Sequence, residues 1–443
     1  MELSTSLIAR LVAVSALAAL TSVGIPSAQA VSPPEIDDRL LPKPALPAPS
    51  RPTVQREVCT MVTGNPAPGR NQLAELDLPR VWRLTRGAGQ RVAVIDTGVS
   101  RHRRLPDVVP GGDYVFTGDG TGDCDAHGTL VAGIIAAAAD SSADGFSGVA
   151  PDVTLISIRQ SSAKFAPASD PSNSGIGDVD TMAKAVRTAA DLGASVINIS
   201  SVACVAVTSA LDDRALAAAL AYAVDVKNAV VVAAAGNTGG GGQCPPQRPD
   251  ASWQTISVVV SPAWYDDYVL TVGSVDDAGA PSAFTLAGPW VDVAATGESV
   301  TSLSSAPLSG TSYAAPVVSG LAALIRARFP ALTARQVMQR IESTAHHPPT
   351  GWNPLVGNGT VDVLAAVSTD SGAPADIAQP PPARAPIGTP APMPTNSHAR
   401  DTALRGAAGC LIAVVCALII GAAKRRLRPS RDDVAGDRRV RPA

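Results

Sequence analysis

Short apolar runs alternate with longer Ala-rich segments of helical periodicity through the middle of this 443-residue chain, and this alternation restricts the possible folds. The runs predicted as strands cover residues 91–95, 153–158, 195–200, 229–235 and 268–273. The segments predicted as helices cover residues 128–139, 181–192, 212–226, 312–328 and 334–343. Strands that alternate with helices pair in parallel and carry helices on both faces. We therefore expect an α/β domain with a doubly wound, mostly parallel sheet.

A serine opens the long helix predicted for residues 312–328. The segment 308–321 reads LSGTSYAAPVVSGL, which puts Ser312 just after a turn and Pro316 in the first helical turn. The positive field of a helix N-terminus favours negative charge that develops at a nearby hydroxyl. A serine before a helix is usually only an N-cap. A catalytic role for Ser312 therefore requires partners elsewhere in the chain.

Two upstream segments supply such partners. Residues 91–99 read RVAVIDTGV, an apolar strand that stops at Asp96, and residues 125–133 read DAHGTLVAG, with His127 opening an apolar helix. Of the five histidines in the chain, His127 is the one at a Gly-flanked strand-to-helix boundary. A nucleophilic serine needs an imidazole to accept its proton and a carboxylate to orient that imidazole. The sequence thus contains a complete Asp/His/Ser set.

An asparagine follows the apolar run of residues 230–235. Gly236 and Asn237 end this predicted central strand, and ligands bind at strand C-termini in open α/β sheets. An asparagine in a turn is common. Together with the Asp/His/Ser set, however, Asn237 is a candidate for stabilising an oxyanion.

The D-T-G at Asp96 also occurs in aspartic proteases, in which two carboxylates share a proton. That mechanism requires a second such motif on a strand. Asp370-Ser371-Gly372 instead opens a Pro-rich segment. This class of protease is therefore excluded.

Six motifs in one order resemble the subtilisin family of serine proteases. They are VAVIDTGV, HGTLVAG, GVAP, SVINIS, VVAAAGN and GTSYAAP, and the resemblance covers roughly residues 78–367. The resemblance implies that Asp96 orients the imidazole, His127 is the general base and then acid, and Ser312 is the nucleophile. It implies an oxyanion hole formed by Asn237 with the backbone N–H of Ser312. The family needs no metal for its chemistry, and although subtilisins often bind structural calcium, no convincing calcium loop can be placed here.

The resemblance also implies where a peptide binds. Ser200, Ser201, Val202 and Gly236 are the expected substrate-binding residues. Many subtilisins carry SLGG where this chain reads SSVA at residues 200–203. Val202 stands in place of a glycine, so we expect a narrowed cleft and a restricted choice of substrate.

The N-terminal residues 1–30 have the pattern of a signal peptide. An apolar stretch ends in Ala28-Gln29-Ala30, an A-x-A cleavage site. Export places the catalytic domain outside the cytoplasm.

The C-terminal region has the pattern of a membrane anchor. Residues 403–423 are predicted as one transmembrane helix, which contains an uncharged apolar run from residue 406. The tail, residues 424–443, has eight basic and three acidic residues and is expected to stay in the cytoplasm. The formal net charge of the chain is −3, and no feature indicates binding to nucleic acid.

Six cysteines fit an exported protein, because disulfides persist in oxidising compartments. Cys410 and Cys416 lie in the apolar span and are expected to be unpaired. The other four permit three connectivities. We favour Cys59–Cys124, which ties the N-terminal arm to the His127 side, and Cys204–Cys244, since both residues follow strands that end on one side of the sheet.

The predicted segments of the chain are a signal peptide (1–30), a Pro-rich extension (31–69), a catalytic domain (70–371), a Pro-rich linker (372–402), a transmembrane helix (403–423) and a basic tail (424–443). The extension is too short and Pro-rich to build its own core, so it is expected to run as a strap over the surface. Residues 160–178 are rich in Ser, Pro and Gly and are interpreted as a flexible insertion, with a partner-binding loop as the alternative.

This succession of segments resembles the mycosins, membrane-anchored subtilisin-like proteases of type VII secretion systems. The resemblance implies a single-pass protein of the cell membrane that cleaves secreted proteins or peptides at its extracytoplasmic side. It also implies association with the membrane components of the secretion system. The alternative is a structural subunit of that complex whose proteolytic activity is dispensable.

Overall fold

A computed structural model describes residues 31–62, 76–140, 145–172, 175–209, 211–239 and 244–368. The predicted signal peptide, linker, transmembrane helix and tail lie outside these residues. Among the described helices, none is long and apolar enough to cross a membrane.

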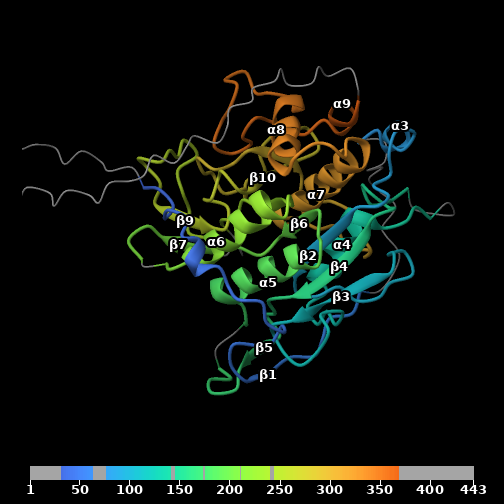
Figure 1. Cartoon of the computed structure of the whole chain (residues 1–443). Coiled ribbons are helices and arrows are strands. Elements are labelled where there is room, and N and C mark those ends of the chain that lie inside the picture. Colours follow the sequence, from blue (N-terminus) through green and yellow to red (C-terminus); the bar gives the residue numbers. More distant parts are fainter. Residues whose placement is uncertain are drawn as a thin grey trace, which may run out of the picture. The chain divides into compact units, whose positions relative to one another are not determined.

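A parallel sheet forms the centre of the described part (Figure 1). Its seven strands follow the order β11-β10-β8-β6-β2-β4-β3, and every neighbouring pair is parallel. The strands are β2 (Arg91–Asp96), β3 (Val108–Asp113), β4 (Thr154–Arg159), β6 (Val196–Ile199), β8 (Val230–Ala234), β10 (Leu270–Val275) and β11 (Val293–Thr296). This subtilisin-like arrangement confirms the predicted mostly parallel α/β sheet.

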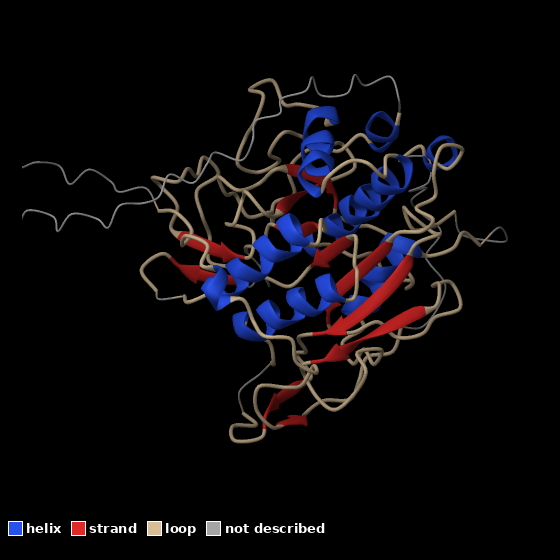
Figure 2. Ribbon diagram, in the orientation of Figure 1, coloured by secondary structure: helices blue, strands red, loops and turns tan. Residues whose placement is uncertain are grey.

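Helices cover both faces of the sheet (Figure 2), which explains why its central strands are almost continuously apolar. They are α3 (Leu78–Val81), α4 (His127–Ala136), α5 (Val179–Asp191), α6 (Arg214–Ala221), α7 (Thr311–Arg328), α8 (Ala334–Thr344) and α9 (Val363–Val367). α5 packs against α6, and α4 packs against α7. A π-helical turn, η2 (Tyr222–Val226), continues α6.

The predicted elements agree with the observed ones to within a few residues, but two strands of the central sheet, β3 and β11, were not predicted. The short helices α3 and α9 and the short strands outside this sheet were not predicted either. β3 reads VVPGGD, whose proline and glycines are poor strand formers. The sheet tolerates Pro110 because β3 is an edge strand, which forms backbone hydrogen bonds with a neighbouring strand on one side only. β11 has four residues, too few to show a pattern by themselves.

The described part of the Pro-rich extension, residues 31–62, runs along the surface of the domain without a core of its own. Its first described residue, Val31, donates its backbone N–H to the carbonyl of Trp253 at 2.8 Å. A short 3-10 turn, η1 (Asp38–Leu40), then contacts α6. Further on, β1 (Thr53–Gln55) pairs antiparallel with β5 (Phe165–Pro167).

The strand β5 lies inside the segment interpreted as a flexible insertion. Ser162 and Ile176 also exchange backbone hydrogen bonds across this segment at 2.9 and 2.8 Å. The described part of residues 160–178 is therefore an ordered partner of the extension, and the interpretation as a flexible insertion was wrong. Its polar composition concealed pairing with a strand about a hundred residues away in the chain.

Two disulfides hold the surface segments. Cys59–Cys124 joins the extension to the loop before α4. Cys204–Cys244 joins β7 (Ala203–Ala206), which pairs antiparallel with β9 (Val258–Ser261), to the loop after β8. These are the two pairings that the sequence analysis favoured.

We expect the Cys59–Cys124 bond to contribute about 4 kcal/mol to stability, because it closes a loop with a sequence separation of 65 residues. The double variant Cys59→Ser/Cys124→Ser of the full-length chain should unfold several degrees below the parent, as followed by circular dichroism on heating. Mild reduction of the parent should lower its midpoint in the same direction. An unchanged midpoint in the double variant would show that the strap is held without this bond.

Candidate active site

Asp96 is the last residue of β2 and is fully buried. Its Oδ1 accepts the backbone N–H of Thr97 at 2.7 Å and lies 2.7 Å from Nδ1 of His127. The carboxylate therefore fixes which ring nitrogen of His127 carries the proton. Nε2 is then left unprotonated.

His127 is the first residue of α4, and its side chain is 28% exposed. The contact with Asp96 requires the start of α4 to lie against the turn after β2. A Cβ at Gly128 would collide with the carbonyl oxygen of Gly98, so only glycine permits this approach at position 128. The residue before the helix, Ala126, has a left-handed backbone with φ 69°, which aims the first turn of α4 at β2.

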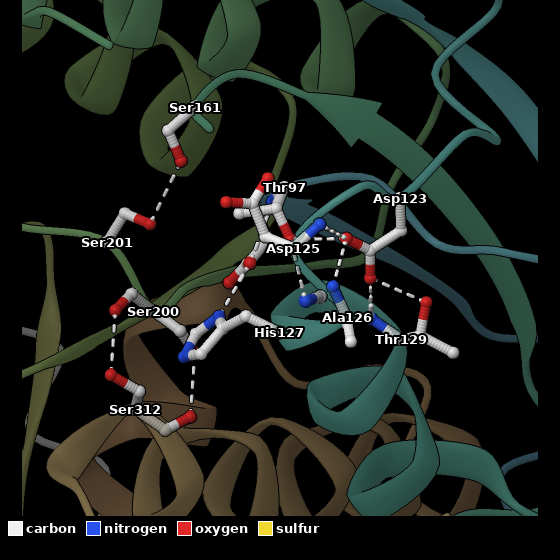
Figure 3. A network of polar contacts seen from close by, with 12 residues as sticks. Thr97, Asp123, Asp125, Ala126, His127, Thr129, Ser161, Ser200, Ser201 and Ser312 are labelled. Atoms are coloured by element: carbon white, nitrogen blue, oxygen red, sulfur yellow. Dashed lines mark hydrogen bonds and ion pairs between the residues drawn. The ribbon is translucent and has the colours of Figure 1, made fainter. Parts of the chain in front are cut away.

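Ser312 is the second residue of α7 and faces the same space (Figure 3). Its Oγ donates to the carbonyl oxygen of Ser200 at 3.1 Å, and Ser200 Oγ donates to the carbonyl of Ser312 at 3.0 Å. The start of α7 is thus tied to the end of β6. The ring centroids of Tyr313 and His127 lie 5.3 Å apart, with the two ring planes tilted by 46°.

Asn237 lies beyond the end of β8, with its amide group held in one orientation. Its Oδ1 accepts both the backbone N–H and the hydroxyl of Thr311, at 2.9 and 3.0 Å. The hydroxyl of Thr311 in turn accepts the N–H of Gly236 at 3.2 Å. Because the amide oxygen is occupied, the Nδ2 donor is left for a ligand beside Ser312.

Most of the predicted site residues line one cavity of about 850 Å³. Its lining includes His127, Asn237 and Ser312 together with all four expected substrate-binding residues, Ser200, Ser201, Val202 and Gly236. Asp96 lies behind His127 and does not line it. The disulfide forms part of one wall, since Cys244 lines the cavity and a Cβ on Gly236 would lie 2.9 Å from its sulfur.

Burial of the His127 ring disfavours its charged form, but nearby carboxylates outweigh this effect. Asp96 acts most strongly, by its charge and its hydrogen bond, and Asp123 and Asp125 add to it. The net result is that the pKa of His127 is raised above its ordinary value of 6.5. Burial and the charges of Asp96 and Asp123 raise the pKa of Tyr313 to about 12, so its ring stays neutral.

Several residues of this region were not predicted from the sequence. They are Thr97, Asp123, Thr129 and Thr311, all of them at most 9% exposed. Thr97 bonds to Asp96 and Thr311 to Asn237, whereas Asp123 and Thr129 bond to each other and to backbone groups near His127. Hydrogen bonds of this kind carry no sequence signature of their own. Within the described residues, no group of three or more His, Cys, Asp or Glu side chains is placed to hold a metal ion.

Comparison with known proteins identifies the family. The model of the subtilase family matches residues 87–359. Mycosin-4 of Mycobacterium tuberculosis is 70% identical over 98% of this chain and 100% of its own length. The chain is a mycosin of the subtilase family. It is accordingly a serine protease.

Solved structures agree with this assignment. The mycosin superposes on a crystal structure of MycP1 from the ESX-1 type VII secretion system with a TM-score of 0.71, at 42% identity, covering 77% of this chain and 97% of that one. It also matches a chain in an intact ESX-5 inner membrane complex with a TM-score of 0.70, at 40% identity, covering 89% of this chain and 100% of that one.

The raised pKa of His127 predicts the pH dependence of the mycosin. Only the neutral imidazole accepts a proton, so reaction of the serine with a fluorophosphonate should slow as the pH falls through a midpoint above 6.5. Asp96→Asn should lower this midpoint and slow the reaction by up to about 10⁴-fold, because the amide stabilises the wrong tautomer. The rate is measured from pH 5 to 9, and an identical profile in both proteins would contradict the pairing of Asp96 with His127.

Proposed function

We propose that the mycosin is an extracytoplasmic serine endopeptidase that cleaves through an acyl-enzyme, with Ser312 as nucleophile, His127 as acid and base, and Asp96 as the orienting carboxylate. One observation carries this proposal. The 2.7 Å contact of Asp96 with Nδ1 of His127 leaves Nε2 available at the cavity that Ser312 also lines.

The first step begins when a peptide carbonyl enters the cavity next to Ser312. The hydroxyl of Ser312 leaves the carbonyl of Ser200, transfers its proton to Nε2 of His127 and attacks the peptide carbon. The imidazolium that forms is stabilised by Asp96, which is buried and so acts in a medium of low dielectric constant. The negative charge of Asp96 thus stabilises the positive charge created by the reaction.

The oxyanion of the tetrahedral intermediate then needs donors. The Nδ2 group of Asn237 supplies one, because Thr311 occupies the amide oxygen. The backbone N–H of Ser312 supplies another, since the first N–H groups of a helix have no acceptor within the helix. His127 then protonates the leaving amine, and water releases the acyl group by the reverse sequence.

The substrate class follows from the walls of the cavity. A peptide binds in extended form along Ser200–Val202, and the side chain of Val202 narrows this wall where many subtilisins have glycine. Asp125 is the charged residue next to His127 in the lining. These features favour secreted proteins with an exposed, extended segment over compact folded surfaces.

The site of action is the outer face of the cell membrane. This proposal rests on the signal pattern of residues 1–30, the apolar stretch in residues 403–423 and the basic residues that follow it. The similarity to a chain of the ESX-5 inner membrane complex supports association with a type VII secretion complex. In this topology one helix anchors the protein and the tail is cytoplasmic.

Labelling of the full-length chain in detergent with a fluorophosphonate tests the catalytic assignment. The parent is expected to be labelled, whereas Ser312→Ala and His127→Ala should lose labelling by at least about 10³-fold, because the nucleophile or its base is gone. Ser305→Ala, which alters an exposed serine of the nearby loop, is the matched control and should label like the parent. Equal labelling of Ser312→Ala would refute the assignment.

A second candidate function is a structural subunit of the secretion complex, because a similar chain occurs within the ESX-5 inner membrane complex. Complementation of a deletion strain with Ser312→Ala separates the two functions. If catalysis is the essential role, secretion should fail although the variant is present in the membrane at the parent level. Secretion that survives would assign the main role to assembly.

A further inference from the structure

One buried carboxylate next to the catalytic residues collects five hydrogen bonds (Figure 3). The Oδ1 atom of Asp123 accepts the hydroxyl of Thr97 at 2.9 Å and the backbone N–H groups of Asp125 and Ala126 at 3.0 and 2.8 Å. Its Oδ2 accepts the N–H and the hydroxyl of Thr129 at 2.9 and 2.6 Å. Asp123 is 9% exposed and does not line the cavity.

The ionised form of Asp123 satisfies all five of these bonds, because a carboxylate only accepts. The hydroxyl of Thr97 accepts the N–H of Gly128 at 2.9 Å, and that of Thr129 accepts the N–H of Ser100 at 3.0 Å. Each hydroxyl proton is therefore directed to Asp123, and all five partners donate. Burial raises the pKa of Asp123, whereas the hydrogen bonds from Thr129 and Thr97 oppose this shift and favour the ionised form.

The network joins the two residues that form the catalytic contact. Thr97 directly follows Asp96, and Gly128 directly follows His127. The hydrogen bond from the N–H of Gly128 to the hydroxyl of Thr97 therefore links the residue after Asp96 to the residue after His127. Asp123 holds that hydroxyl from the other side. It also holds the N–H of Ala126, whose left-handed backbone aims the first turn of α4.

We propose that Asp123 is a positioning residue that fixes His127 relative to Asp96 and supplies a second negative charge behind the imidazole. The inference rests on the proposed catalytic role of His127. Asp123 acts through the backbone and through Thr97, and it touches neither the substrate cavity nor the reacting atoms.

The negative charge of Asp123 affects the pKa of His127, which an uncharged residue with a purely structural role would not do. The groups that act on the ring of His127 are Asp96 from β2, Asp123 and Asp125 from the loop before α4, and the neutral Tyr313 from α7. Burial lowers the pKa of His127, whereas Asp96 most strongly, and then Asp123 and Asp125, raise it. Loss of the charge on Asp123 should therefore lower the pKa of His127.

The variant Asp123→Asn of the full-length chain tests both effects. The asparagine amide keeps the shape of the carboxylate but replaces one oxygen by an NH₂ group. This NH₂ group would face groups that donate hydrogen bonds to Asp123, so some of these bonds are lost. We expect the limiting rate of fluorophosphonate labelling to fall about 10- to 100-fold with little change in the concentration for half-saturation, because the imidazole is misplaced. The acid limb of the pH profile should move to lower pH.

Asp119→Asn is the matched control. Asp119 lies in the same loop and accepts the N–H and hydroxyl of Thr121 at 2.9 and 2.7 Å, but it is exposed and its hydrogen bonds do not reach α4. The Asp119→Asn change also removes one negative charge, but it leaves the hydrogen bonds of Asp123 intact. The labelling rate and pH profile of this variant should therefore equal those of the parent. An Asp123→Asn protein that unfolds like the parent, labels within twofold of it and keeps its acid limb would overturn the proposal.

A second pair of variants covers the case in which Asp123→Asn does not fold. Thr129→Val removes one hydroxyl donor from Asp123, whereas Thr129→Ser retains it. We expect slower labelling in the valine variant and recovery in the serine variant at equal thermal stability, and equal rates in both would overturn the proposal. Absence of labelling in the folded parent would instead refute the proposed function, so the two failures are distinguishable.

Discussion

The contact between Asp96 and His127 is the constraint on which the active site depends. It joins the carboxyl end of a central strand to the first residue of a helix on another segment of the chain. The 2.7 Å distance requires the turn after β2 and the start of α4 to touch, and this is why Gly128 cannot carry a side chain. Ser312 and Asn237 are then added from α7 and β8, whose ends meet at the same edge.

Much of the fold could be predicted because the sheet is covered on both faces. Strands such as residues 230–234 are then continuous apolar runs, and the helices between them keep their own periodicity. β3 and β11 escaped prediction because their positions in the sheet depend on tertiary pairing, which a short or Gly-containing segment does not reveal. The pairing of β1 with β5 escaped for the same reason, since it joins distant segments of polar composition.

The site divides in the same way. Asp96, His127 and Ser312 could be proposed from the sequence, because serine-protease chemistry demands these residue types and each stands at the end of a strand or the start of a helix. Asp123 and Thr311 could not, because a carboxylate or hydroxyl that holds a backbone group looks like any polar loop residue. Only the folded arrangement shows that Thr311 orients Asn237 and that Asp123 receives five donors.

The same loop links the catalytic geometry to the N-terminal extension. Cys124 directly follows Asp123, forms the disulfide with Cys59, and accepts the N–H of Thr60 at 2.8 Å through its carbonyl. The extension therefore holds the turn that positions His127, although it has no core of its own. A strap attached at this point stabilises the site from outside the cavity, since Cys59 and Thr60 are absent from its lining.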